Sequence, residues 1–103
     1  MIAQTPPVPY YAVIFTSIRT GVDEGYGDMA AEMVRLATEQ DGFLGVESAR
    51  NDTGITVSYW KNTDAIRTWK ANTSHLLAQK YGRDKWYEEY KVRICLVERD
   101  YGF

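Results

Sequence analysis

Strand-like and helix-like segments alternate along this chain, and their order limits the fold more than any other feature. Two segments, residues 23–40 and 62–80, carry apolar residues three and four positions apart, as amphipathic helices do. Four segments rich in β-branched and aromatic residues are predicted to be β-strands: residues 10–19, 43–50, 55–61 and 86–100. The predicted order is therefore strand, helix, strand, strand, helix, strand.

The residues between these segments have the chemistry of turns and helix caps. Asp23 is expected to cap the first helix and Gly42 to end it. The sequence Asn51-Asp52-Thr53-Gly54 favours a hairpin turn, so the strands on either side of it should pair antiparallel. The second helix is expected to begin at Asn62-Thr63-Asp64. Its apolar stripe consists of Ile66, Trp69, Leu76 and Leu77.

This order predicts an α+β, ferredoxin-like βαββαβ fold, with a four-stranded antiparallel sheet and two helices on one of its faces. The prolines at positions 6, 7 and 9 make residues 1–9 an extended N-terminal leader. Residues 10–103 are then expected to form a single domain.

The face of the sheet that the helices leave open must be solvated or covered by a partner. If Ile14, Val57, Ile94 and Leu96 pack under the helices, the open face still carries apolar side chains. These are Val13, Phe15, Trp60, Cys95 and Val97. Because an exposed apolar patch of this kind is an interaction site, we expect a homodimer whose sheets pack face to face. The alternative is that these residues lie singly on the surface.

Charge and apolar content exclude several classes of partner. With a net charge of -2 and basic residues interspersed among acidic ones, the chain offers no basic surface for nucleic acid or an anionic membrane. No apolar run approaches the roughly 20 residues that cross a bilayer. The lone Cys95 cannot form an internal disulfide, and residues 1–9 lack the basic start and apolar stretch of a signal peptide. We therefore expect a protein of the reducing cytoplasm.

His75 is the first candidate for acid–base chemistry, because histidine is the side chain whose charge ordinarily changes near neutral pH. It follows Trp69 by six positions, so the two side chains do not share a helical stripe. His75 then lies either at the mouth of a pocket between helix and sheet or on the surface. Trp69 either stacks on a planar aromatic ligand or belongs to the core. One His and one Cys, 20 positions apart, offer no metal-ligand spacing, and we expect no metal and no cofactor.

Taken together, four stretches of the chain resemble the antibiotic biosynthesis monooxygenase family, whose members are small dimeric α/β-barrel proteins. They are YYAVIFTS (residues 10–17), MAAEMVRLATEQDGFLGVESAR (29–50), GITVSYWKNTDAIRTWK (54–70) and SHLLAQKYGRDKWYEEYKVRICLVER (74–99). The resemblance implies a cofactor-independent monooxygenase that acts on a small aromatic or phenolic substrate. His75 would be the catalytic base or a hydrogen-bond partner, and Phe15, Tyr59 and Trp69 would line the substrate pocket.

The same superfamily includes haem-degrading monooxygenases, and the residues argue against that branch. Those proteins have an Asn on the first strand and an axial His that follows a Trp on the second helix. Here the first strand has no Asn, and the corresponding position, ten residues after Trp69, is Gln79. Two non-catalytic alternatives remain. One is a small-molecule-binding or stress-associated dimeric protein of the same fold; the other is a chain whose aromatic residues serve only the dimer interface.

Overall fold

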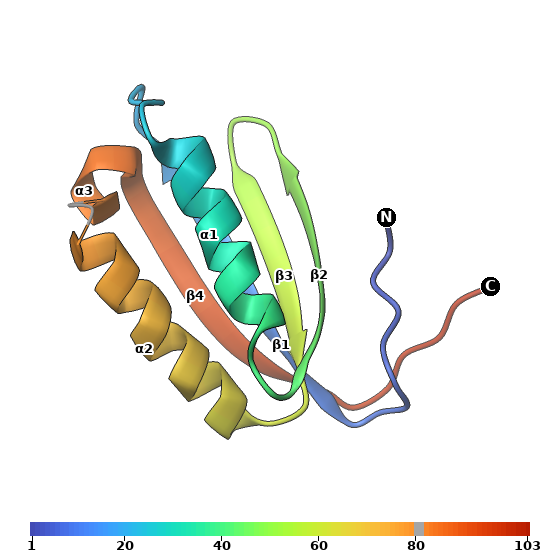
Figure 1. Ribbon diagram of the computed structural model, residues 1–103. Helices are drawn as coiled ribbons and strands as arrows, with labels where there is room; N and C mark the ends of the chain where they lie inside the picture. Colours follow the sequence, from blue (N-terminus) through green and yellow to red (C-terminus); the bar gives the residue numbers. More distant parts are fainter. Residues whose placement is uncertain (80–81) are drawn as a thin grey trace.

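The computed structural model describes the backbone of residues 1–79 and 82–103 and the side chains of residues 1–76 and 84–103. In this part of the chain the elements are β1 (Tyr10–Arg19), α1 (Tyr26–Thr38), β2 (Phe43–Arg50), β3 (Gly54–Trp60), α2 (Thr63–Gln79), α3 (Gly82–Trp86) and β4 (Tyr87–Val97). Within these residues four strands form one antiparallel sheet in the order β2-β3-β1-β4. The helices lie on one face of it, which confirms the predicted ferredoxin-like βαββαβ fold (Figure 1).

The last strand is shorter than predicted. The short helix α3 occupies Gly82–Trp86, and its five residues span too few turns for a helical period to appear in the sequence. β4 ends at Val97 because Val97 pairs with Tyr10, where β1 begins. The predicted end of the second helix near Lys80, and the Leu77 side chain of its stripe, lie outside the described residues.

The helix starts confirm one predicted cap and correct another. The Asn62 side-chain oxygen accepts a hydrogen bond from the Ala65 backbone N–H at 2.8 Å, as expected of a cap. Asp23 does not cap α1 with its side chain. Gly25 takes the N-cap position at φ 78°, without a side-chain cap bond, and the Asp23 carboxylate lies 3.1 Å from Arg19 Nη2 instead. The left-handed backbone at Gly25 brings the chain into α1 two residues later than the sequence predicts.

The contacts of β1 and β3 show which face of the sheet lies under the helices. Val13 and Trp60 are buried in one cluster with Ala37 of α1 and Ile66 of α2. The expectation that Ile14 and Val57 pack under the helices is therefore wrong, because these residues pair with each other and alternate with the helix-facing set. Both alternating sets of β1 are apolar, so the period of the strand does not tell the two faces apart.

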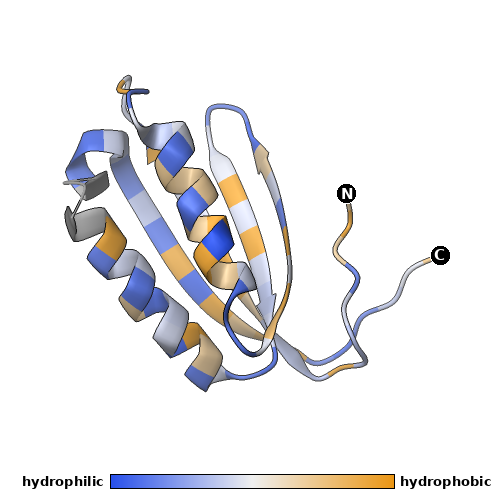
Figure 2. Cartoon of the chain, in the orientation of Figure 1, coloured by the Kyte–Doolittle hydropathy of each residue, from blue (hydrophilic) through white to orange (hydrophobic). Residues whose placement is uncertain are grey.

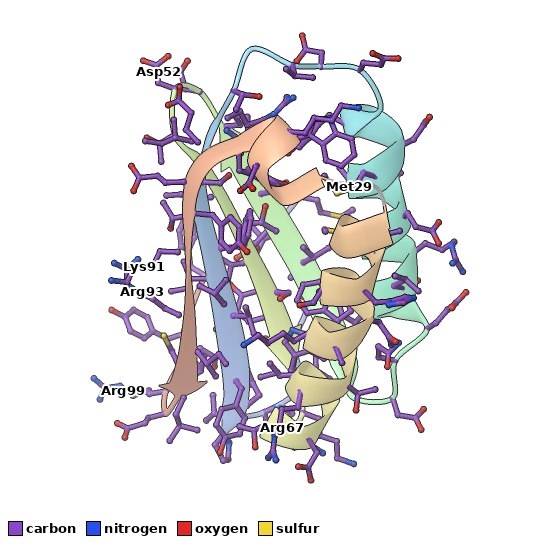
Figure 3. All side chains as sticks on the ribbon, turned by 90° about the vertical axis from the view of Figure 1, so that its left-hand side faces the viewer. Met29, Asp52, Arg67, Lys91, Arg93 and Arg99 are labelled. Carbon is purple, nitrogen blue, oxygen red and sulfur yellow. The ribbon has the colours of Figure 1, made fainter. Side chains whose placement is uncertain are left out.

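A second buried cluster lies at the other end of the helix layer. It consists of Met29, Trp86 and Tyr87, with Phe15, Tyr26 and Met33 packed against it. The Trp86 indole N–H donates to the Glu24 carbonyl at 2.8 Å, which ties α3 to the loop before α1. Figure 3 shows Met29 on the helix side of the sheet, whereas Lys91 and Arg93 of β4 point away from the helices.

Both terminal segments are bound to the open face of the sheet. The Ala3 backbone N–H donates to Glu47 Oε2 at 2.9 Å. The Tyr10 hydroxyl accepts from Thr5 Oγ1 at 3.1 Å and donates to Asp100 Oδ2 at 2.5 Å. Tyr10 is therefore buried although no helix covers it.

The long helices carry polar residues along the side shown in Figure 2. Among the described residues no helix combines the length and the apolar character needed to span a membrane.

Candidate functional site

A row of uncovered apolar side chains runs along the helix-facing side of β4. Tyr90, Val92, Ile94 and Leu96 pair in register with Ser17, Phe15, Val13 and Tyr11 of β1. Because directly paired residues point to the same face, these β4 residues face the helix layer. They nevertheless remain 38%, 43%, 53% and 49% exposed, respectively. We call these four residues the apolar strip; the alternation of apolar and polar residues along β4 is visible in Figure 2.

The strip is exposed because β4 is an edge strand of the sheet. The buried cluster under α1 and α2 is built on β1 and β3, so it does not reach across β4. At its far end, Leu96 borders a shallow surface depression together with Val97, Glu98 and Arg99. An exposed apolar surface of this kind marks an interaction site.

Phe15 forms the wall between the strip and the core. The centroid of its ring lies 5.2 Å from that of Tyr90 in the strip and 5.5 Å from that of Tyr87 in the second cluster. Its ring is only partly buried. Of the residues predicted to line a pocket, Phe15 is the one that borders the strip directly.

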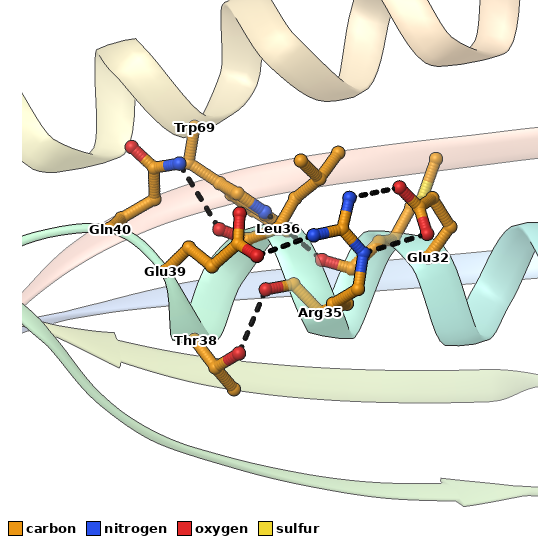
Figure 4. A network of polar contacts seen from close by, with 8 residues as sticks. Glu32, Arg35, Leu36, Thr38, Glu39, Gln40 and Trp69 are labelled. Atoms are coloured by element: carbon orange, nitrogen blue, oxygen red, sulfur yellow. Dashed lines mark hydrogen bonds and ion pairs between the residues drawn. The ribbon is translucent and has the colours of Figure 1, made fainter.

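Trp69 lies on the same side of the sheet but is used by the core. The centroid of its ring is 5.2 Å from that of Trp60, and its indole N–H donates to the Met33 carbonyl of α1 at 3.3 Å. Figure 4 shows this indole beside the C-terminal part of α1, where Arg35 pairs with Glu32 and Glu39. The hydrogen-bonding atom of Trp69 therefore joins α2 to α1, which leaves its partly buried ring as the part that a ligand can touch.

Tyr59 lies on the opposite, open face. Its hydroxyl donates to Glu47 Oε1 at 2.5 Å, and its ring meets that of Tyr10 edge-on at 5.8 Å. Burial, together with the bond to Glu47, raises the pKa of the Tyr59 phenol to about 12, so the phenol keeps its proton at neutral pH. The sheet separates Tyr59 from Phe15 and Trp69, and one small molecule cannot touch all three.

His75 is exposed on α2. Thr73 is buried and Leu76 partly buried, so these residues belong to the side of α2 that faces the core and His75 does not. The structure thus brings Phe15 and Trp69 to the helix-facing side and leaves His75 at the surface of α2.

The sequence reasoning missed a polar group at the end of the strip, which we call the arginine cluster: Ser17, Arg19, Tyr26, Arg50 and Tyr87. Ser17 is 1% exposed, and its hydroxyl accepts a hydrogen bond from Arg50 Nη2 at 2.5 Å. The Arg19 guanidinium carbon lies 3.3 Å from the centroid of the Tyr26 ring. Burial raises the pKa of the Tyr87 phenol well above its ordinary value, and a hydrogen bond with Tyr26 raises it further.

Only part of the arginine cluster had a signal in the sequence. Ser17 and Arg19 are two positions apart on one strand, and the alternation of side chains along a strand puts such residues on one face. Arg50 joins them through the register of three strands, since it pairs with Gly54 and Gly54 pairs with Ser17. Strand periodicity does not contain that register.

Metal-ligating side chains are scattered in the part of the chain that the structure describes. No three of its His, Cys, Asp and Glu residues gather closely enough to hold a metal ion. Cys95 is a free thiol on β4, opposite Ala12.

Sequence comparison identifies relatives over most of the chain. Residues 9–81 match the model of a family described as antibiotic biosynthesis monooxygenase. The uncharacterized protein YqjZ of Bacillus subtilis is 52% identical over 100 residues, which cover 95% of this chain and 88% of that protein.

Structural comparison shows the same fold in proteins of low sequence identity. A mutant of SnoaB, a cofactor-independent oxygenase from Streptomyces nogalater, superposes with a TM-score of 0.72 at 13% identity, over 90% of this chain and 97% of that one. The protein PA3566 from Pseudomonas aeruginosa superposes with a TM-score of 0.68 at 17% identity, over 91% and 97% of the two chains.

Proposed function

Because the chain belongs to the antibiotic biosynthesis monooxygenase family, we propose that it is an oxygenase that uses neither metal nor flavin and acts on a small aromatic or phenolic substrate. The observation that carries this proposal is the apolar strip, which leaves an apolar surface exposed beside Phe15 on the helix-facing side of the sheet. The substrate ring would lie along Val92 and Ile94, with Phe15 as one wall and the exposed part of Trp69 as another. Tyr59 would contribute only to a molecule held on the open face.

An electron-rich anthrone illustrates the chemistry that such a site can support. Once its methylene carbon loses a proton, the resulting carbanion reacts with O₂ and needs no further electron donor. One oxygen atom ends in the new carbonyl group and the other leaves as water, so the four electrons that O₂ accepts all come from the substrate carbon. The protein supplies binding, orientation and a base.

His75 is our candidate for that base, and its exposed position requires the substrate to reach the surface of α2. The test is oxygen uptake with an anthrone, measured against autoxidation without protein. We expect protein-dependent uptake and, because a positioned base contributes roughly 10²–10⁴-fold, a fall of at least about tenfold in His75→Ala. Ser74→Ala, at the neighbouring exposed position, is the control and should keep the rate.

The two failures of this experiment have different meanings. An unchanged rate in His75→Ala removes His75 from the mechanism but leaves the oxygenase. Absence of protein-dependent uptake with anthrones and phenols contradicts the oxygenase itself.

A second candidate function, binding without catalysis, is favoured by the composition of the strip. Apart from the Tyr90 phenol its side chains are hydrocarbon, and His75 is directed to solvent. A binding protein of this kind would show a higher melting temperature with an aromatic ligand, because a ligand that binds only the folded state stabilises it, while consuming neither ligand nor O₂.

We also propose that the protein is a homodimer with the open faces of its sheets in contact. The support is the apolar content of that face, where Ile14, Ile55 and Val57 lie on neighbouring strands and Ile55 is 45% exposed. Sedimentation at micromolar concentration should give twice the 11.8 kDa of the chain. A free Cys95 on the same face agrees with our proposal of a reducing, cytoplasmic location.

A further inference from the structure

The arginine cluster contains the guanidinium group of Arg50, which among the described residues is bound to a hydroxyl and not to a carboxylate. The guanidinium of Arg50 lies across Gly54, since a Cβ on Gly54 would collide with Arg50 Nη2. Glycine at this position lets Arg50 cross β3 and reach the buried Ser17 on the central strand. The side chain of Arg50 thus bonds to a neutral hydroxyl, and the ion pairs of the described residues include none with Arg50.

Arg19 brings a second guanidinium to the same end of the sheet. Its Nη2 donates to the Val22 carbonyl at 2.9 Å and pairs with Asp23 at 3.1 Å, but the Asp23 side chain is 89% exposed, so that pair is largely solvated. Arg19 Nε is buried and, within the described residues, has no hydrogen-bond acceptor. A buried donor without an acceptor is unfavourable, so the Arg19 guanidinium is not fully satisfied by the hydrogen bonds of the described residues.

The rest of the cluster supplies no negative charge. Tyr87 is buried, the centroid of its ring lies 6.0 Å from that of Tyr26, and both guanidinium groups act electrostatically on its phenol. Because burial holds Tyr87 in its protonated form, the phenol is a neutral neighbour. The cluster therefore presents two guanidinium groups, a hydroxyl and a phenol with an unfilled need for an anionic oxygen.

The apolar strip ends at this cluster. Ser17 is paired with Tyr90, and the Tyr90 ring is 5.2 Å from Phe15. A ligand that lies along the strip therefore meets hydrocarbon and aromatic rings along its body and arginine at its end.

We propose that the ligand of this site is an aromatic carboxylic acid, whose ring lies against Phe15, Tyr90 and Val92 and whose carboxylate is bound by Arg19 and Arg50. Only the oxidation of this acid rests on the proposed function. The binding of the acid does not depend on it. A guanidinium group offers paired N–H donors that match the two oxygens of a carboxylate. A neutral amide of the same shape has one acceptor oxygen and no charge, so it cannot use both donors.

The test compares 2-naphthoate with 2-naphthamide, which have the same ring and differ in charge. Titration calorimetry on the full chain should show naphthoate binding roughly tenfold tighter or better, since hydrogen bonds to charged groups are about twice as strong as neutral ones. Arg50→Gln should remove most of this preference and leave the affinity for naphthamide unchanged. Arg67→Gln is the matched control, because Arg67 is exposed and pairs with Asp64 on α2.

A second variant separates position from charge. Gly54→Ala keeps Arg50 but pushes its guanidinium away from Ser17, so it should also weaken naphthoate selectively. Equal affinity of the two probes for the unaltered protein would overturn the proposal, as would equal losses in Arg50→Gln and Arg67→Gln. Naphthoate preference without oxygen uptake from any hydroxylated aromatic acid would leave the binding site standing and count against the oxygenase alone.

Discussion

The hydrogen bond between Tyr59 and Glu47 shows how one residue pair can be structural where the sequence suggested a ligand contact. Tyr59 is the principal cause of the lowered pKa of Glu47, and the Ala3 backbone N–H adds to it. A carboxylate that accepts two such bonds is stabilised in its charged form. The pair therefore binds the N-terminal segment to β2 and β3.

This pair predicts a loss of stability in acid. Because folding lowers the pKa of Glu47, its contribution is complete above the unfolded value of about 4.3 and is lost as the pH falls through the folded value. The free energy of unfolding in urea should fall between pH 6 and pH 3 less steeply in Glu47→Gln than in the unaltered protein. Glu98→Gln, which removes an exposed carboxylate beyond β4, should keep the original slope. Identical slopes in all three proteins would contradict the assignment to Glu47.

At the scale of elements, residue patterns predicted the order and type of the strands and long helices. They did not predict which side of β1 meets the helices, because Ile14 and Phe15 are equally apolar. They also missed α3, whose five residues show no period. Faces and short helices are decided by contacts with distant residues, such as Val13 with Ala37 and Ile66.

The candidate site follows the same rule. Trp69 was predicted to lie in the helical stripe and does so, whereas Phe15 was expected on the open face and lies on the helix-facing side instead. The exposed strip and Arg50 depend instead on β4 being an edge strand and on the alignment of β2 with β3. Those are properties of the assembled sheet, and the residue pattern within a single segment does not reveal them.

Packing of α1 predicts one large effect. Met29 is 0% exposed and fills the cluster with Trp86 and Tyr87. Met29→Ala should lower the free energy of unfolding by about 2–5 kcal/mol, because the surrounding side chains cannot close the cavity completely. Val34→Ala, at a position of α1 that is 45% exposed, should change it by about 0.5 kcal/mol or less. Denaturant unfolding measures both, and equal losses would show that α1 is not anchored at Met29.

At the scale of the whole molecule, the two faces of the sheet have different proposed tasks. In the functions proposed above, the open face forms the contact between the two copies of the chain and the helix-facing side binds the ligand. Val57 and Ile94 allow the two to be separated, because Val57 pairs with Ile14 on the open face and Ile94 pairs with Val13 on the helix-facing side.

A charge placed on one face should therefore affect either dimerisation or ligand binding, but not both. We expect Val57→Lys to sediment as a monomer, since a buried unpaired charge opposes the contact between sheets. Ile94→Lys should remain a dimer and lose its affinity for aromatic ligands. If Val57→Lys sediments as the unaltered protein does, the open face is not the interface.

The central position of β1 also sets the timing of folding. Tyr11, near the start of the chain, pairs with Trp60 on one side and with Leu96 on the other. The pairing of Tyr11 with Leu96 joins residues that are far apart in the sequence, so it closes a long loop. Non-local pairing of this kind slows folding, so we expect β4 to join the sheet late and one edge of β1 to lack its hydrogen-bond partners until then.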